Sequence, residues 1–234
     1  MKLIMIPFGG GNKFSYNYLK KYLAQDIKMI AVELPGRGSR MNEELLYNAS
    51  DLVGDIYNKL KTEMEPPYAI YGHCMGGLIG YLFARKVYEE DGFLPNQLLV
   101  SGCPGPSYYH SLGKVEISDN EIRDMLLDFG TSNQLLENEE FFEMISPMVR
   151  ADFKVLNEYR HQQLDPILIP ITIVIEPGSR FSMEELSLWR LETELDVDFH
   201  SLSAKIHESA KSFAALVNSR LFSRYKSKNE SQIS

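Results

Sequence analysis

Residues 68–87 read YAIYGHCMGGLIGYLFARKV, a short apolar run, a glycine-rich turn and a longer apolar run. The first run predicts a buried strand and the second a helix packed on apolar neighbours. Cys74 lies at the turn between them, flanked by Gly72 and Gly76. In G-x-S-x-G turns the nucleophile has a strained backbone, and the glycines let strand and helix approach closely. The pattern therefore predicts a nucleophile elbow with cysteine in the place of serine.

The position of Cys74 also bears on its reactivity. A cysteine at a helix N-terminus faces the positive end of the helix dipole, which is expected to lower the thiol pKa and favour the thiolate. The alternative is an inert buried cysteine in a glycine-rich turn, because Cys is among the most buried residue types. The strand, turn and helix together favour the nucleophile.

The composition limits the class of protein. At 234 residues, 44% of them apolar, the chain fits one globular domain. Its net charge of −8 argues against nucleic acid as a partner. Two cysteines are too few for a disulfide framework and indicate a reducing compartment. No leader and no long apolar run is evident, so we expect a cytoplasmic monomer without a membrane partner.

Short apolar runs alternate with helical patterns along the chain. Strands are expected at residues 3–6, 28–32, 69–71, 97–101 and 171–175, and helices near 15–23, 50–64, 77–90, 184–194 and 207–224. This alternation predicts an α/β fold, with a mostly parallel sheet flanked by helices. We expect a single domain at residues 1–225, followed by a polar tail at 226–234.

The alternation breaks between the strands expected at residues 97–101 and 171–175. The intervening chain has helical patterns at 119–129, 139–144 and 148–162. So long an excursion is usually a lid or a substrate-binding cap, placed at about residues 104–165. Its apolar side chains either line an acyl channel or attach the cap to the body: Met125, Leu126, Leu127, Phe141, Phe142 and Met144.

A second glycine-rich loop, PFGGG at residues 7–11, follows the first expected strand. Beside an elbow, such a loop supplies a backbone N–H to an oxyanion hole, here from Gly9, and the N–H of Met75 completes it. The alternative is a dinucleotide fingerprint, because Glu33 lies about twenty residues further on, where a ribose-binding acid would lie. Phe14 at the third glycine position argues against this alternative.

Several motifs occur in the order found in a known family. PFGGG at 7–11 resembles P-[FY]-A-G-G, LPGRGSR at 34–40 resembles L-P-G-R-G-x-R, GHCMGG at 72–77 resembles G-H-S-M-G-G, and SPMVRAD at 146–152 resembles P-x-x-R-A-D. The chain is similar to type II thioesterases, the stand-alone α/β-hydrolases of nonribosomal peptide and polyketide assembly lines. The resemblance implies an α/β-hydrolase fold with a helical cap. It also implies acyl substrates carried as thioesters by a phosphopantetheinyl carrier protein, with no cofactor and no metal.

Two positions depart from the family pattern. A gapless alignment with the family's G-x-x-D motif puts Glu176 at the glycine and Ser179 at the triad aspartate. The family's G-G-H-F motif corresponds to KIHE at residues 205–208, which keeps the histidine as His207. A serine nucleophile needs a base and an acid, whereas cysteine can form a thiolate paired with protonated histidine. We therefore interpret Cys74 and His207 as a dyad. Glu176 is a candidate surrogate acid, and Ser179 is a candidate neutral partner for the imidazole.

Other residues are candidates for substrate binding or structure. Phe8, Cys103 and Arg37 are candidate substrate-binding residues. Cys103 should share a sheet edge with Cys74, where it either lines the pocket or packs. Arg37 either meets an acidic carrier protein or a phosphopantetheine phosphate, or is solvated. Alternation along the elbow points His73 away from the substrate side and predicts a structural role, and no residues have metal-ligand spacing.

Three functions fit these residues. Water as acceptor for an acyl group on Cys74 gives a thioesterase with the hydrolytic, proofreading activity that the resemblance implies. An amine or alcohol acceptor gives an acyltransferase or cyclase, because amines attack thioesters more readily than water does. The missing acid and the lost G-G-H glycines favour instead a degenerate scaffold that binds carrier proteins without turnover. Hydrolysis is the function we expect first.

Overall fold

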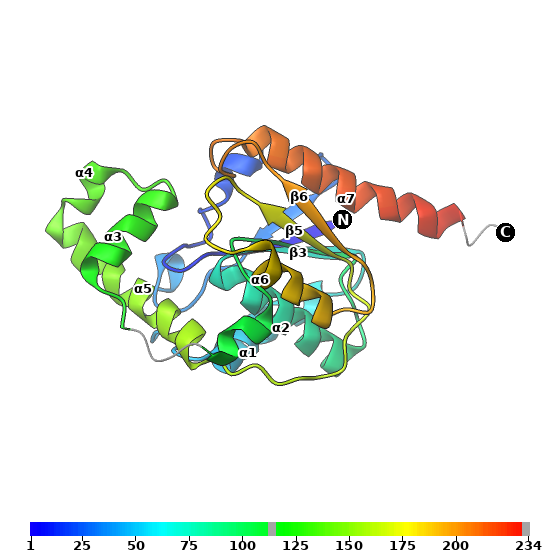
Figure 1. The fold of residues 1–234 in the computed structure, drawn as a ribbon, viewed down its shortest axis with the longest axis horizontal. Coiled ribbons are helices and arrows are strands. Elements are labelled where there is room, and N and C mark those ends of the chain that lie inside the picture. Colours follow the sequence, from blue (N-terminus) through cyan, green and yellow to red (C-terminus); the bar gives the residue numbers. More distant parts are fainter. Residues whose placement is uncertain (112–115, 231–234) are drawn as a thin grey trace.

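A computed structural model describes residues 1–111 and 116–230 (Figure 1). Six strands form one sheet, in the order β2-β1-β3-β4-β5-β6, and every neighbouring pair is parallel. The strands are β1 Lys2–Ile6, β2 Lys28–Ala31, β3 Tyr68–His73, β4 Gln97–Ser101, β5 Ile171–Ile175 and β6 Val197–Ser201. The predicted α/β fold with a parallel sheet is therefore confirmed. Parallel strands all end at the same edge, so the loops after β1, β3, β5 and β6 meet there.

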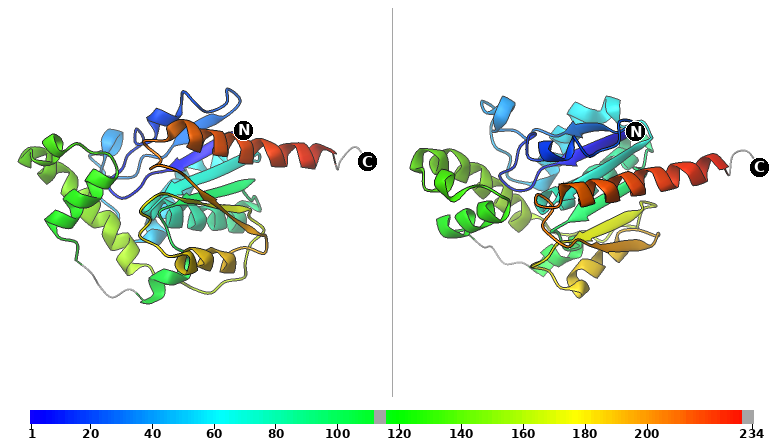
Figure 2. Two further views of the ribbon diagram at one scale, coloured as in Figure 1. Left: turned by 45° about the horizontal axis from the view of Figure 1, so that its top comes forward. Right: turned by 90° about the horizontal axis from the view of Figure 1, so that it is seen from above.

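Helices cover both faces of the sheet (Figures 1 and 2). On one face lie α1 Ala49–Leu60, α2 Met75–Asp91 and α6 Met183–Ser187, and on the other lies α7 Ala210–Glu230. Side chains along β1 alternate between these layers, with Ile4 and Ile6 facing α1 and α2 and Leu3 and Met5 facing α7. This alternation follows from the period of two of a strand and explains why the strands read as continuous apolar runs.

Three helices form a separate cap beyond the end of the sheet (Figure 1). They are α3 Asp119–Asp128, α4 Asn133–Leu136 and α5 Glu139–Glu158. A capping box between Ser118 and Glu121 begins α3. The two helices expected at 139–144 and 148–162 form the single helix α5, with Pro147 inside it. Phe142 and Val149, on either side of this proline, are buried in the same cap core, which holds the helix together.

Three other expectations differ from the structure. Strand β6 was not expected, because it lies at the sheet edge and its half-exposed side chains form no apolar run. Residues 15–23 form turns and a short 3₁₀ helix, Asn17–Leu19, instead of an α-helix. Helix α7 continues to Glu230, past the helix end expected near residue 224. Residues 231–234 of the expected tail lie outside the described residues.

Candidate active site

The backbone of Cys74 has the strained geometry of a nucleophile elbow. Its φ is +53° and its ψ −123°, and it is the only non-glycine residue with positive φ in the described ranges. Its N–H donates to the carbonyl of Ser101 at the end of β4 (2.8 Å), and its carbonyl accepts from the N–H of Gly77 (2.9 Å). Such a conformation costs about 1–3 kcal/mol and persists where the surroundings enforce it, typically at functional sites. The predicted strand, elbow and helix are all present.

The flanking glycines are required by close backbone packing. A Cβ atom on Gly72 would lie 1.9 Å from the carbonyl oxygen of Gly76. A Cβ on Gly76 would lie 2.4 Å from the carbonyl oxygen of Ile6 and 2.7 Å from that of Pro7. Distances this short leave no room for any side chain. The start of α2 is thereby pressed against the end of β1, next to the glycine-rich loop.

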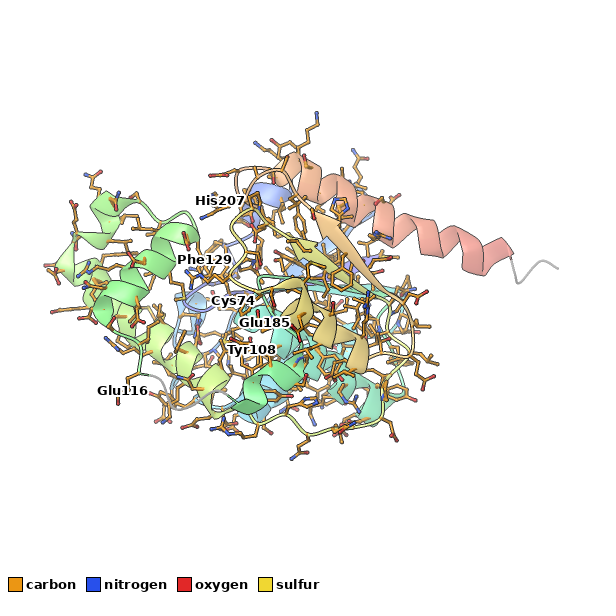
Figure 3. All side chains as sticks on the ribbon, in the orientation of Figure 1. Cys74, Tyr108, Glu116, Phe129, Glu185 and His207 are labelled. Atoms are coloured by element: carbon orange, nitrogen blue, oxygen red, sulfur yellow. The ribbon has the colours of Figure 1, made fainter. Side chains whose placement is uncertain are left out.

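A cavity of about 370 Å³ opens at this edge of the sheet, between the body and the cap. Cys74, His207 and Glu176 line it from the body, while Met125 and Phe129 line it from the cap. Figure 3 shows Cys74 and His207 on the side of the body that faces the cap, with Phe129 at the end of the cap beside them. Rings account for much of the wall: Phe8, Tyr16, Tyr18, Tyr71, Tyr108, Tyr109, Phe129, Phe153 and Phe181. The cavity suits a largely apolar group.

The apolar cap residues divide between the two expected roles. Met125 lines the cavity. Leu126 and Phe142 are buried in the core of the cap itself, with Phe141 packed against that core. Met144 is exposed, as is Leu127, and neither lines the cavity. Met125 also belongs to the cap core, so it takes part in both cavity lining and cap packing, whereas Leu126, Phe141 and Phe142 only pack the cap.

The ionisation of Cys74 differs from the expectation. Burial raises the pKa of its thiol, although the N–H of Met75 and the positive charge of Arg180 oppose the rise. The expected lowering by the helix terminus is therefore wrong in direction, because loss of hydration outweighs the favourable dipoles. Thiolate formation then depends on a proton acceptor in the cavity.

The two expected oxyanion donors lie on different elements, Gly9 in the loop after β1 and Met75 at the start of α2. Gly9 is buried, and the N–H of Gly10 donates to Asp152 Oδ2 (2.7 Å). The backbone N–H of Met75 lowers the pKa of the Cys74 thiol, against the larger effect of burial. The N–H of Gly9 has no acceptor among the residues that the structure describes. An oxyanion hole built from Gly9 and Met75 stays a prediction.

Arg37 corrects a prediction, because its side chain is buried and fully engaged. It is 4% exposed and forms a bidentate ion pair with Asp152 on α5, at 2.6 and 2.7 Å. It also donates to the carbonyl of Gly11 (3.1 Å). A guanidinium held in this way cannot meet a carrier protein or a phosphate. Arg37 instead ties the glycine-rich loop to the cap.

Cys103 also corrects a prediction. Its side chain is completely buried and does not line the cavity. The sulfur donates to the carbonyl of Pro104 (3.4 Å) and lies 3.7 Å from the Tyr109 hydroxyl. Of the two alternatives, packing is the correct one. Phe8, by contrast, lines the cavity, with its ring 4.2 Å from that of Phe129.

The structure brings His207 and Glu176 into the cavity with Cys74. His207 follows β6, is one third exposed (33%), and its Nε2 lies 3.9 Å from Glu208 Oε1. Glu176 follows β5, and its Oε1 accepts the N–H of Ile206 (2.7 Å). Burial raises the pKa of Glu176, while this N–H and the charge of His207 oppose the rise. No hydrogen bond joins Glu176 to the His207 ring in the described structure.

Ser179 has a different role from the expected one. Its hydroxyl donates to the carbonyl of Phe181 (3.2 Å) and accepts from the N–H of the same residue (3.3 Å). The side chain therefore closes its own exposed loop and does not orient the imidazole of His207.

His73 faces the cavity, contrary to the expectation that it points away. Its Nδ1 lies 2.7 Å from Ser101 Oγ and 3.5 Å from Glu176 Oε2. Burial and the nearby charge of His207 lower its pKa to about 4, so the ring is neutral at pH 7. His73 is the last residue of β3 and lies on the same side of the sheet as Tyr71, which also lines the cavity, so strand alternation itself turns its ring toward the cavity.

Comparison with known proteins identifies the family. Residues 1–218 match the thioesterase domain. This chain belongs to the thioesterase family. Thioester hydrolysis is accordingly its activity class.

The thioesterase resembles proteins of peptide and polyketide pathways. It is 27% identical to the Gramicidin S biosynthesis protein GrsT of Aneurinibacillus migulanus over 83% of this chain and 77% of GrsT. It is also 27% identical to the Linear gramicidin dehydrogenase LgrE of Brevibacillus parabrevis, over 94% of this chain and 87% of LgrE. The type II thioesterase BorB from the borrelidin biosynthetic cluster has a TM-score of 0.83 at 26% identity, covering 94% of this chain and 92% of BorB. The predicted resemblance to type II thioesterases is confirmed.

The described residues contain neither a metal-ligand cluster nor a membrane-spanning helix. No group of three or more His, Cys, Asp or Glu side chains there has an arrangement that could hold a metal ion. No helix in the same part of the chain has the length and apolar character needed to cross a membrane.

Proposed function

We propose that this thioesterase hydrolyses acyl thioesters presented by a phosphopantetheinyl carrier protein, through an acyl-enzyme on Cys74. The observation that carries the proposal is the strained elbow, which presents Cys74 to a cavity that it shares with His207. A strained nucleophile position without catalysis would cost stability for no gain. Relatives named for gramicidin and borrelidin biosynthesis support a carrier protein as the source of the acyl group.

The first half-reaction transfers the acyl group to the enzyme. His207 takes the thiol proton of Cys74, and the sulfur attacks the thioester carbonyl carbon. The N–H groups of Gly9 and Met75 stabilise the oxyanion. The tetrahedral intermediate then expels the pantetheine thiolate, which receives the proton from His207. One thioester replaces another, so this exchange is nearly thermoneutral.

The second half-reaction releases the acid. His207 takes a proton from water, whose oxygen attacks the acyl carbonyl on Cys74. Collapse of the second intermediate breaks the carbon–sulfur bond, and the sulfur recovers its proton from the imidazolium. The products are a free carboxylic acid and the original thiol. Aromatic rings form much of the cavity wall, which favours acyl groups with little polarity.

Mass spectrometry of the protein mixed with an acyl-carrier protein tests the proposal. We expect an acyl adduct on Cys74 and release of free acid, and loss of both in Cys74→Ala. Cys103→Ser is the matched control, because that thiol is buried outside the cavity and should leave both results unchanged.

Three results would overturn the proposal. Absence of both adduct and free acid would indicate a scaffold without turnover. An adduct released only by an added amine would indicate an acyltransferase. Undiminished hydrolysis by Cys74→Ala would exclude Cys74 as the nucleophile.

A further inference from the structure

A continuous chain of contacts joins the backbone of the nucleophile to the loop that carries His207. The Cys74 N–H donates to the Ser101 carbonyl (2.8 Å), and Ser101 Oγ lies 2.7 Å from His73 Nδ1. The same nitrogen lies 3.5 Å from Glu176 Oε2. The other oxygen of Glu176 accepts the N–H of Ile206 (2.7 Å), the residue before His207.

The members of this chain are buried and have few alternative partners. Ser101 is completely buried, and its hydroxyl also contacts the Tyr71 hydroxyl (2.8 Å). The side chains of His73 and Glu176 are 14% and 16% exposed. Buried polar groups keep their hydrogen bonds, because an unpaired group costs about 1–3 kcal/mol. Hydrogen bonds therefore hold β3 to β4 and the loop after β5 to the loop after β6, and the 3.5 Å approach of Glu176 to His73 brings these two pairs together.

Glu176 lines the cavity with Cys74 and His207, but its carboxylate acts on a different atom from the one a triad acid would contact. A triad aspartate contacts the imidazole, where it both orients the ring and compensates its charge. Glu176 instead contacts the backbone of the preceding residue, Ile206. Charge compensation is less needed with cysteine, because its thiolate itself pairs with the imidazolium. Orientation is still needed, and a hydrogen bond to the adjacent N–H can supply it.

We propose that Glu176 is a positioning residue, which sets His207 against Cys74 through the Ile206 N–H and through His73. The role rests on the proposed function, since it concerns the same dyad. Glu176 does not act as the acid of a triad. The neutral ring of His73 links Glu176 to Ser101 and so to the nucleophile.

Three variants separate positioning from charge compensation. Glu176→Gln keeps an oxygen that can accept the Ile206 N–H but loses the charge, and Glu176→Ala loses both. Glu208→Gln is the matched control, because it removes a carboxylate 3.9 Å from His207 that makes no contact with Ile206 in the described structure. The readouts are kcat and KM for an acyl-carrier protein, and hydrogen exchange of the Ile206 amide.

We expect kcat of Glu176→Gln and Glu208→Gln within about threefold of wild type, because the hydrogen bond to Ile206 survives in both. Glu176→Ala should lose about 100-fold in kcat with KM unchanged, because a displacement of about 1 Å at a reacting group costs that much. The Ile206 amide should exchange about tenfold faster in Glu176→Ala alone. Equal melting temperatures of the variants would show that the differences in kcat do not arise from unfolding.

Two results would overturn the positioning role. If Glu176→Gln is as impaired in kcat as Glu176→Ala, the charge matters and Glu176 is a triad acid. If Ile206 exchange is the same in wild type and Glu176→Ala, the carboxylate does not hold the loop. The exchange measurement needs no turnover, so it tests the positioning role even where the wild-type protein fails to hydrolyse the substrate.

Discussion

The two sides of the active site are held in place by different forces. Cys74 stands between strand β3 and helix α2, where backbone atoms of β1 approach Gly76 so closely that no Cβ fits. His207 stands on an exposed loop, where the contact of Glu176 with Ile206 holds the backbone beside it. Close packing therefore fixes the nucleophile, and polar contacts fix the histidine.

The difference extends to what each side contacts across the cavity. On the nucleophile side, the ring of Phe129 in the cap packs against Phe8 and His73, with ring centroids 4.2 and 5.2 Å apart. On the histidine side, a Cβ on Gly130 would lie 3.5 Å from His207 Cδ2. Phe129 and Gly130, which directly follow α3, thus contact the nucleophile side and the histidine side of the cavity, respectively. Substitutions that add atoms should therefore destabilise the nucleophile side most. Substitutions that remove a charge should act mainly on the histidine side and on the contact of the cap with the body.

Gly76→Ala should have the largest effect on stability. Its new Cβ would meet the carbonyl oxygens of Ile6 and Pro7, which are backbone atoms of a central strand end and cannot move aside. We expect a loss of about 4–5 kcal/mol in the free energy of unfolding, measured by urea denaturation. Gly54→Ala in α1 is the control, because a Cβ there meets nothing within 4 Å. It should stabilise by about 0.5–1 kcal/mol, and an equal loss in both variants would contradict the steric argument.

The next largest effect is expected in the reactivity of Cys74: its alkylation rate should rise about tenfold per pH unit. Burial raises the pKa of the thiol, so the protonated form predominates at neutral pH and the thiolate increases as pH rises. Alkylation by iodoacetamide should accelerate with pH and level off only above the ordinary thiol pKa of about 8.5. Cys103→Ser should give the same profile, because Cys103 is inaccessible. A plateau below pH 7.5 in the free enzyme would show that His207 already holds the thiol proton.

The nucleophile side was also the part most accessible from sequence. Strands β3, β4 and β5 were predicted within a few residues, because buried parallel strands read as local apolar runs. The elbow followed from Gly72, Cys74 and Gly76, whose spacing reflects contacts within one short turn. Contacts between residues that are close in the sequence produce recognisable sequence patterns, so the nucleophile side could be predicted from the sequence.

The remaining contacts depend on residues far apart in the chain. Arg37 pairs with Asp152, 115 positions away, and nothing near Arg37 in sequence shows that it is buried. Asp152 was visible within the SPMVRAD motif, but only the fold gives it its partner. The contact of Glu176 with Ile206 likewise joins the loops that follow two strands, one of which, β6, has no apolar run. Polar roles set by tertiary contacts cannot be assigned from spacing alone.

The smallest effect is expected at the contact between cap and body on the histidine side. Asp128 at the end of α3 pairs with Arg180 and Lys205, at 2.9 and 3.0 Å, and these two ion pairs are largely exposed. Exposed pairs contribute about 0–1 kcal/mol, so Asp128→Asn should leave the free energy of unfolding within that range. The cap tip should separate more often from the body, and alkylation of Cys74 should accelerate by up to about fivefold.

Salt provides the decisive comparison for this contact. Rising ionic strength screens exposed ion pairs, so alkylation of Cys74 should accelerate with salt in the wild type and much less in Asp128→Asn. Asp119→Asn is the control, because its pair with Arg150 is equally exposed but joins two parts of the cap. Equal salt dependence in Asp128→Asn and wild type would show that the phenyl ring of Phe129, and not the charge of Asp128, holds the cap over the site. In that case packing governs both sides of the cavity, and the contrast between them is confined to the loop of His207.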